Sequence, residues 1–311
     1  MKKLRIARFL ILVCGLFLFG CSCGAQSGPA VSAPPSGPSA SAGISGAPSA
    51  QSREPEPTPE PTPEPTPEPT PEPTPEPAAQ NTRLYVLMYH AFTEDENMAG
   101  DWTTTTDCFR QDLQWLTDHN YTFVLPGDLA AGRPLPPKAV MLSFDDGYVD
   151  NYTLAYPILQ EFHAKAVISL IVSQQEGSDP RSLSWDMCRE MADSGLVEFG
   201  SHTFRCHQPN LEYGTYGIQR RPGETREAYE ARVFPDLQRS IDAIEEQLGR
   251  PVLLFAYPHG KQESWAAGYI QEHFSVTLLT LSGVSDVSNG LYGLFRYNIS
   301  PTSRPGMYMA A

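Results

Sequence analysis

The stretch KAVMLSFDDGY, residues 138–148, decides the fold of this chain. Residues 138–142 are short, apolar and β-prone, which predicts a buried parallel strand. The strand leads to Asp145 and Asp146, which are followed by Gly147. Because adjacent carboxylates repel one another, a cation between them, or a different task for each, would relieve the cost. Asp-Gly is also a common turn dipeptide, so a plain turn is the alternative interpretation.

Short apolar runs alternate with helical stretches from residue 81 onward. The expected strands are residues 84–89, 121–124, 138–142, 166–172, 197–199, 252–257, 276–279 and 294–299. The expected helices are residues 106–119, 152–162, 184–194, 225–248 and 264–272, with Pro235 breaking or restarting the long one. This alternation predicts an α/β fold with about seven parallel strands in a closed or nearly closed barrel covered by helices.

Polar side chains follow several of the expected strands directly. They are His90, Asp145 with Asp146, His202 with His207, and Tyr257-Pro258-His259. In barrels of parallel strands the chemistry lies at the C-terminal ends of the strands. If the strands are parallel, all of these residues gather on one rim, which favours a functional site over a plain turn at residues 145–147.

Four residues separate His202 from His207, and on a loop that leaves a strand this spacing lets two imidazoles converge on one cation. One added carboxylate completes a two-histidine, one-aspartate site with open positions for water and substrate. Such a site suits a divalent metal that acts as Lewis acid and activates water. Cys206 is a rival ligand, because its sulfur lies four positions after His202.

The motifs SFDDGY (143–148), SHTFRCH (201–207) and FAYP (255–258) resemble those of the polysaccharide deacetylases, the NodB-homology or carbohydrate esterase family 4 group. The resemblance covers about residues 83–300. It implies a distorted (β/α) barrel and the metal-dependent removal of acetyl groups from an N-acetylated polysaccharide. Zn²⁺ is the expected metal for a ligand set of two histidines and one aspartate, with Co²⁺, Ni²⁺ or Mn²⁺ as alternatives.

The resemblance assigns roles position by position. Asp145 matches the general base, Asp146 the metal-ligand aspartate and His202 the first metal histidine. Many members have the second histidine four residues after the first, where this chain has Cys206. Members that resemble the poly-N-acetylglucosamine deacetylases share the longer spacing, so His207 is favoured as the third ligand.

Two departures from the family pattern affect the other roles. The common arginine motif is not visible near Tyr257 and Pro258, and the late Leu-His-Asp motif is missing because no histidine follows His273. The poly-N-acetylglucosamine group places the general-acid histidine on its first strand, and His90 fits that arrangement. Tyr257, Pro258 and His259 are implied to contact the substrate, with the backbone N–H of His259 at the oxyanion.

The first 80 residues predict export and a spacer. Residues 1–20 have a basic start and an apolar core, as in a signal peptide, and Leu18-Phe19-Gly20-Cys21 resembles a bacterial lipobox, with Cys21 as the lipidated residue. Residues 21–80 are rich in Ser, Ala and Pro and include Glu-Pro-Thr-Pro repeats, whose 24 residues (54–77) would extend roughly 75 Å. We therefore expect a deacetylase domain over residues 81–311 at the extracellular face of the cell membrane, or secreted if no lipid is attached.

Charge limits the partners. Residues 81–311 hold 17 basic and 29 acidic residues, a formal net charge of -12, which argues against nucleic acid and is compatible with a neutral or cationic glycan. We expect a monomer. Two other functions stay open: a glycoside hydrolase that uses Asp145 and Asp146 as an acid/base pair, and a glycan-binding wall lipoprotein on an inactive deacetylase fold.

Overall fold

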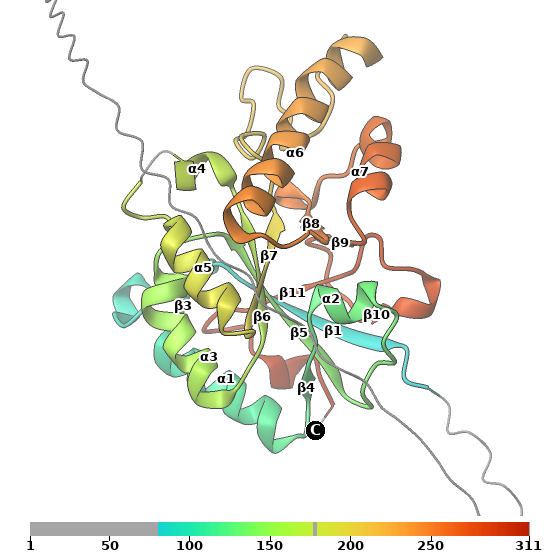
Figure 1. The fold of residues 1–311 in the computed structure, drawn as a ribbon. Helices are drawn as coiled ribbons and strands as arrows, with labels where there is room; N and C mark the ends of the chain where they lie inside the picture. Colours follow the sequence, from blue (N-terminus) through green and yellow to red (C-terminus); the bar gives the residue numbers. More distant parts are fainter. Residues whose placement is uncertain (1–79, 177–178, 311) are drawn as a thin grey trace, which may run out of the picture. The chain divides into compact units, whose positions relative to one another are not determined.

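The computed structural model describes residues 80–176 and 179–310 (Figure 1). The predicted signal peptide, Cys21 and the linker up to residue 79 lie outside the described residues. Within the described part, no helix combines the length and apolar character that crossing a membrane requires.

Eleven strands and seven α-helices make up the described part of the chain. The strands are β1 (Arg83–Tyr89), β2 (Ala91–Thr93), β3 (Thr103–Thr105), β4 (Thr122–Phe123), β5 (Ala139–Asp146), β6 (Ala166–Leu170), β7 (Val197–Ser201), β8 (Leu254–Ala256), β9 (Val276–Leu278), β10 (Ser285–Asp286) and β11 (Tyr297–Asn298). The α-helices are α1 (Thr106–Asp118), α2 (Pro126–Ala130), α3 (Tyr156–Phe162), α4 (Val172–Glu176), α5 (Trp185–Asp193), α6 (Arg226–Leu248) and α7 (Ala267–His273). Every predicted strand and helix has a counterpart here, with shifted ends.

The main sheet runs in the order β10-β1-β5-β6-β7-β8-β9, with β4 beside β5 and β11 beside β1. All neighbours are parallel except β1 and β10. The sheet curls, and one segment contacts strands near both of its ends: Leu294 bridges to Leu278 of the end strand β9, and Tyr297 pairs with Leu87 of β1, the strand next to β10. The predicted distorted α/β barrel with about seven mostly parallel strands is confirmed.

The central strand β5 is longer than predicted. The sequence predicted an end at Leu142, but the strand continues through Asp146, because its last residues pair with β6 up to the Asp146–Leu170 partners. All eight residues of β5 are buried, with β1 on one side and β4 and β6 on the other. The two carboxylates are therefore the last two residues of a buried strand rather than part of the loop after it.

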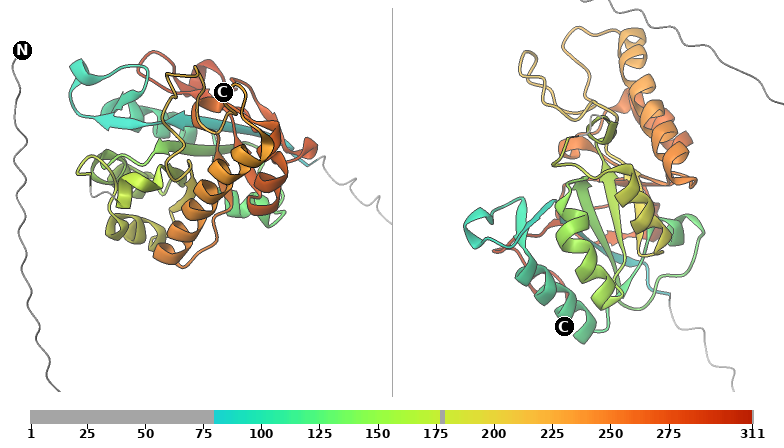
Figure 2. Two further views of the ribbon diagram at one scale, coloured as in Figure 1. Left: turned by 90° about the horizontal axis from the view of Figure 1, so that it is seen from above. Right: turned by 60° about the vertical axis from the view of Figure 1, so that its left-hand side comes forward.

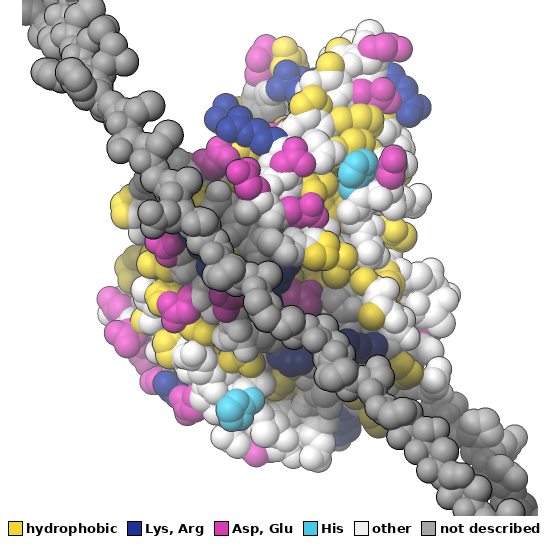
Figure 3. Space-filling model, in the orientation of Figure 1, with side chains coloured by type: hydrophobic (Ala, Val, Ile, Leu, Met, Phe, Trp, Pro, Cys, Tyr) yellow, Lys and Arg dark blue, Asp and Glu magenta, His cyan; other side chains and the backbone are white. Residues whose placement is uncertain are grey.

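Apolar side chains cover both faces of the sheet, as expected for parallel strands that are buried on both sides. In β1, Leu84 and Val86 belong to the cluster inside the curl, whereas Leu87 and Tyr89 belong to the cluster under the helices. Helix α1 packs against α3, and α5 packs against α6, on the outside of the sheet (Figures 1 and 2). On the face in Figure 3, acidic and basic side chains are interspersed.

Helix α6 corrects the prediction for Pro235. The sequence predicted that this proline breaks or restarts the helix, but α6 is one helix of 23 residues with Pro235 inside it. Val233 and Leu237, on either side of the proline, are fully buried in the core. Their packing holds both halves of the helix in line although the proline lacks a backbone N–H.

Candidate active site

Asp145 and Asp146 lie at the carboxyl end of β5 and are 2% and 8% exposed. After them the chain turns sharply, with φ of 75° at Asp146 and 79° at Gly147. A Cβ at Gly147 would lie 2.6 Å from the Cδ2 atom of Leu170, so only glycine fits there. A non-glycine residue with positive φ is strained, and such strain is held where the surrounding structure fixes it, often at functional sites.

The side chains of Asp146, His202 and His207 come together in a group that could hold a metal ion. The Oδ1 atom of Asp146 lies 3.6 Å from Nε2 of His202 and 3.3 Å from Nε2 of His207. The three candidate ligand atoms lie within 4.8 Å of one another. The same Oδ1 atom is buried and has no hydrogen-bond partner among the described residues. An orphaned carboxylate oxygen facing two imidazole nitrogens fits a divalent cation.

Both histidines are in the form that binds a metal. Burial lowers the pKa of His202 to about 4, and burial together with the nearby His259 lowers the pKa of His207 to about 4. Both rings are therefore neutral near pH 7, with a nitrogen lone pair available. The Nδ1 atom of His202 lies 2.8 Å from the carbonyl oxygen of Ala256 and donates to it, which leaves Nε2 as the acceptor that faces Asp146.

Helix α6 holds the loop that carries His207. The carboxylate of Asp236 accepts hydrogen bonds from the backbone N–H groups of Phe204 at 3.0 Å and Arg205 at 2.9 Å. From the other side, the Nε2 atom of His259 lies 2.9 Å from the carbonyl oxygen of His207. The loop is thus fixed on both sides of the residue that faces the cation position.

Cys206 does not join this group. The metal-capable cluster found among the described residues contains Asp146, His202 and His207 only. The Cys206 side chain instead lies beside Asp236, and burial, with a smaller effect of that carboxylate, raises the pKa of its thiol to about 12. A protonated thiol is a poor metal ligand, so the chemistry also favours His207.

Arg296 is a site residue that the sequence analysis missed. Its side chain is fully buried, and its Nη1 atom donates to Asp145 Oδ1 at 2.7 Å and to Ser143 Oγ at 2.9 Å. Its Nε atom donates to the carbonyl oxygen of Leu279 at 2.6 Å. Burial alone would raise the pKa of Asp145, but Arg296, with His202 and His90, outweighs it and holds that pKa well below its usual range.

A signal for Arg296 was present in the sequence. It stands in the apolar run that predicted the strand at residues 294–299, two positions after Leu294. In an extended segment such residues share a face, and both are buried here. A charged residue on the inward face of a strand needs a partner of opposite charge.

His90 directly follows β1 and lies near the same carboxylates. Burial lowers its pKa, while Asp145 and Asp146 act in the opposite direction. Its carbonyl oxygen accepts a hydrogen bond from Asn151 Nδ2 at 2.8 Å, and its ring packs edge to face on Trp102 with centroids 4.7 Å apart. The ring atom Nδ1 is buried and has no hydrogen-bond partner in the described part of the chain.

In the segment Tyr257-Pro258-His259, the first two side chains are buried and the third lies at the candidate site. Tyr257 packs on Phe255 with ring centroids 4.9 Å apart and belongs to the core under the helices, and Pro258 is buried. His259 has a positive φ of 55°, and its ring lies 4.8 Å from the ring of His207. The structure therefore brings His259 to the site, whereas the Tyr257 ring packs in the core.

Comparisons with known proteins agree with this geometry. A sequence model described as polysaccharide deacetylase matches residues 132–273. The chain is 27% identical over 212 residues to the poly-β-1,6-N-acetyl-D-glucosamine N-deacetylase of Escherichia coli strain K12. The match covers 59% of this chain but only 32% of that enzyme, so the chain spans about a third of the length of the relative.

Solved structures share the fold. A de-N-acetylase from Aggregatibacter actinomycetemcomitans superposes with a TM-score of 0.64 at 26% identity, over 71% of this chain and 96% of the other. The deacetylase PplD of Streptococcus pyogenes, solved with acetate, superposes with a TM-score of 0.60 at 25% identity, over 71% of this chain and 93% of the other. These similarities support the curled, mostly parallel sheet as the fold of the chain.

Proposed function

The chain belongs to the polysaccharide deacetylase family, and from that premise we propose that it is a metal-dependent hydrolase that removes N-acetyl groups from a polysaccharide containing N-acetylglucosamine. The observation that carries this proposal is the cluster of Asp146, His202 and His207 beside an ionised Asp145. The acidic surface supports a neutral or cationic glycan. The named substrate of the Escherichia coli relative, poly-β-1,6-N-acetyl-D-glucosamine, supports the choice of sugar.

The proposed mechanism divides the work between the two adjacent carboxylates. Asp146, His202 and His207 would hold the cation, for which Zn²⁺ is the best match. When bound, the cation supplies a Lewis acid that polarises the acetyl carbonyl and lowers the pKa of water. Asp145 stays free of the cation and, kept ionised by Arg296, takes the proton from the attacking water.

Two further groups complete the proposed mechanism. His90, once protonated, donates a proton to the leaving amine, and the nearby charges of Asp145 and Asp146 favour that protonated form. The backbone N–H of His259, whose ring lies against His207, stabilises the negative oxygen that develops on the acetyl group. Trp102, packed on His90 and 56% exposed, shields the proton donor from bulk water on one side.

The geometry disfavours a glycoside hydrolase. Such an enzyme needs one carboxyl group that stays protonated as general acid near neutral pH, and therefore a raised pKa. Arg296 instead lowers the pKa of Asp145. A glycoside hydrolase also leaves the convergence of His202 and His207 unexplained.

We further propose that the mature protein is attached to the extracellular face of the cell membrane through lipid on Cys21. The basic start, apolar core and lipobox-like Leu18–Cys21 support this location. Metabolic labelling with a radioactive fatty acid tests it: label should appear in the wild-type protein and be absent from Cys21→Ala. Equal labelling of both proteins would contradict it.

Acetate release is the direct test of the activity. Purified protein would be incubated with N-acetylglucosamine oligomers and with peptidoglycan, with a chelator and after metal is restored. We expect release that the chelator stops and that Zn²⁺ or Co²⁺ restores, with no release by Asp146→Asn. Shortened glycan chains without acetate would instead support a glycoside hydrolase. Glycan binding without any turnover by the metal-loaded protein would support a binding role.

A further inference from the structure

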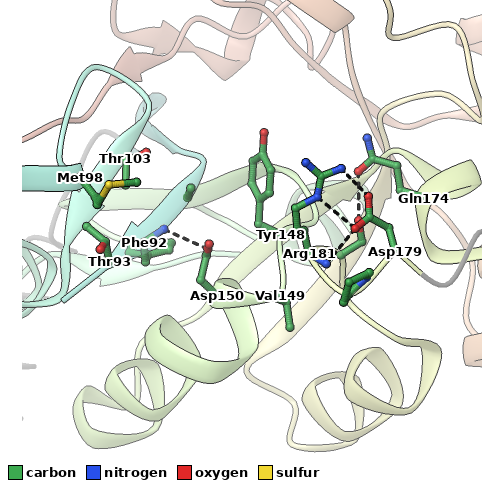
Figure 4. Close-up of a pocket in the computed structure, with 13 residues that line it drawn as sticks. Phe92, Thr93, Met98, Thr103, Tyr148, Val149, Asp150, Gln174, Asp179 and Arg181 are labelled. Carbon is green, nitrogen blue, oxygen red and sulfur yellow. Dashed lines mark hydrogen bonds and ion pairs between the residues drawn. The ribbon is translucent and has the colours of Figure 1, made fainter. Parts of the chain in front are cut away.

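A cavity of about 500 Å³ lies beside the carboxyl end of β5 (Figure 4). This volume is within the range of sites that bind small molecules. Three segments line it: residues 91–93 after His90, residues 148–150 after Gly147, and residues 179–182 before α5. Two of these segments directly continue from the residues that we place in the chemistry.

Tyr148 lines the cavity and stands two positions after the candidate metal ligand Asp146. Asp150, another lining residue, follows Tyr148 by two positions, so one short segment joins Asp146 to the cavity. A polymer whose reacting sugar contacts Asp146 would place a neighbouring sugar against Tyr148.

The cavity has walls of two chemical kinds. Phe92 and Met98 supply apolar surface, and Met98 is 67% exposed. Tyr148, Asp150 and Gln174 supply hydrogen-bonding groups. The Oε1 atom of Gln174 already accepts from Ser182 at 3.2 Å, which leaves its amide N–H groups available. A pyranose ring matches these walls, because its C–H faces are apolar and its hydroxyl groups form hydrogen bonds.

One carboxylate oxygen of Asp150 accepts hydrogen bonds from the described residues, and the other does not. Its Oδ1 atom accepts a hydrogen bond from the backbone N–H of Phe92 at 2.9 Å (Figure 4). It also accepts one from Asn151 Nδ2 at 3.2 Å. No residue in the described part of the chain donates to Oδ2. Burial raises the pKa of Asp150 to about 6 although the hydrogen bonds from Phe92 and Asn151 act in the opposite direction, so the ionised carboxylate lacks full compensation. A cationic ligand would supply it.

The lining carries an uncompensated negative charge. Among the described residues of the lining, Arg181 is the one cation, and it forms a two-point ion pair with Asp179, with Nε–Oδ1 and Nη2–Oδ2 distances of 3.1 and 2.8 Å. The pair is internally neutral, which leaves Asp150 as the net charge. An ammonium group suits this lining better than an acetamide or a second anion.

We propose that this cavity binds the hexosamine residue next to the one being deacetylated, and that Asp150 selects that neighbour in its deacetylated, ammonium-bearing form. This inference rests on the proposed function, because the reaction itself produces the ammonium group. Each product residue then becomes a ligand for the next turnover on the same chain. Deacetylation would spread along the polymer from residues that are already deacetylated.

Defined disaccharides test the proposal by binding. The ligands are N-acetylglucosamine disaccharide and its two mono-deacetylated forms, β-1,4- and β-1,6-linked, measured by isothermal titration calorimetry on the metal-loaded full chain with Asp145→Asn to block turnover. The two mono-deacetylated disaccharides differ in which sugar carries the free amine. We expect one of them to bind at least about tenfold tighter than the diacetylated ligand, as for a charge-assisted hydrogen bond. Adding Asp150→Asn should remove that preference.

Controls keep the binding test decisive. Asp150→Asn retains an Oδ1 acceptor for Phe92 and Asn151. It replaces only the Oδ2 atom, which is the one available to a ligand in the cavity, and removes the charge. Asp107→Asn, an exposed residue of α1, removes the same charge elsewhere and should keep the preference. If Asp150→Asn fails to fold, the affinities of the disaccharides for the chain that keeps Asp150 still test the proposal. Equal affinities for the diacetylated and mono-deacetylated ligands would overturn it.

The two proposals can fail separately. Acetate release by the wild-type chain, with no preference among the disaccharides, would overturn the cavity assignment and leave the deacetylase intact. A preference that depends on Asp150, without acetate release from any disaccharide or polymer, would support the cavity and overturn the proposed function.

Discussion

Asp145 and Arg296 are buried against each other although 151 positions separate them in the sequence. Removing either charge alone would leave the other buried without compensation, which is among the costly changes in a protein interior. The pair also fixes the protonation state of Asp145 in a place where burial alone would favour the neutral acid. In the proposed mechanism Arg296 is thus a positioning residue that acts through Asp145.

Arg296→Gln should move the acid limb of the activity profile. Asp145 takes up a proton only when ionised, so activity falls as the pH drops through its pKa. Without the guanidinium, burial raises that pKa, and we expect the acid limb of kcat/KM to shift upward by at least about one pH unit. Arg296→Lys, which keeps the charge, should shift it less. Superimposable pH profiles for all three proteins would contradict this role.

The choice between His207 and Cys206 can be tested by metal content. Loss of an outer partner of a ligand typically weakens metal binding 10–100-fold, so loss of the ligand His207 should weaken it by roughly hundredfold or more. We expect zinc bound by the wild type and by Cys206→Ser, and little zinc bound by His207→Ala, in equilibrium dialysis with elemental analysis. Zinc lost only from Cys206→Ser would assign the ligand to the sulfur.

At the scale of elements, α1 is tied to β1 and to the C-terminal segment by one buried carboxylate. Asp112 of α1 is 1% exposed and accepts from Tyr89 Oη at 3.1 Å and from Arg304 Nε at 2.7 Å. Tyr89 is the last residue of β1 and directly precedes His90. The position of the proposed proton donor therefore depends on this contact between three elements.

Asp112 should make stability depend on pH. Burial, only partly offset by Arg304, raises its pKa to about 6 from 3.8. Between these values the folded state holds the proton more tightly than the unfolded state, so the free energy of unfolding falls as the pH rises from about 4 to about 6, by as much as about 3 kcal/mol. Asp112→Asn should show a smaller fall in urea denaturation. Parallel curves for both proteins would contradict this.

Local patterns predicted the elements well because strand and helix alternate clearly and the sheet is buried on both faces. They also predicted that Asp146, His202 and His207 meet, since all three lie at or just after the carboxyl ends of parallel strands. Local rules failed at Pro235, where packing of the flanking residues outweighs the effect of the ring. They could not predict the partner of Arg296, because that contact depends on how β11 pairs with β1 across the whole fold.

On the scale of the whole molecule, the metal-capable group joins distant parts of the sheet. Asp146 ends β5, His202 follows β7, and His207 lies on the loop toward α6. A cation bound by all three side chains would stabilise the folded state, because the unfolded chain has no equivalent binding site. Binding and folding are therefore linked.

Zinc should raise the melting temperature. At a free concentration one hundred times the Kd, binding adds about 2.7 kcal/mol to the free energy of unfolding, which corresponds to a shift of several degrees for a domain of this size. Differential scanning fluorimetry should show this shift for the wild type and for Asp107→Asn but not for Asp146→Asn. An equal shift in Asp146→Asn would mean that zinc binds elsewhere.

The segment from Leu294 to Asn298, which contacts both β9 and β1, also determines the order in which the parts of the site form during folding. An exported chain emerges on the outer side of the membrane N-terminal end first, and its early parts fold first. All three candidate metal ligands have emerged once His207 has, but Arg296 follows 89 positions later. Cation capture can therefore precede the arrival of the counter-ion of Asp145. The nascent protein would pass through a metal-loaded but chemically silent stage, which ends when this last strand docks.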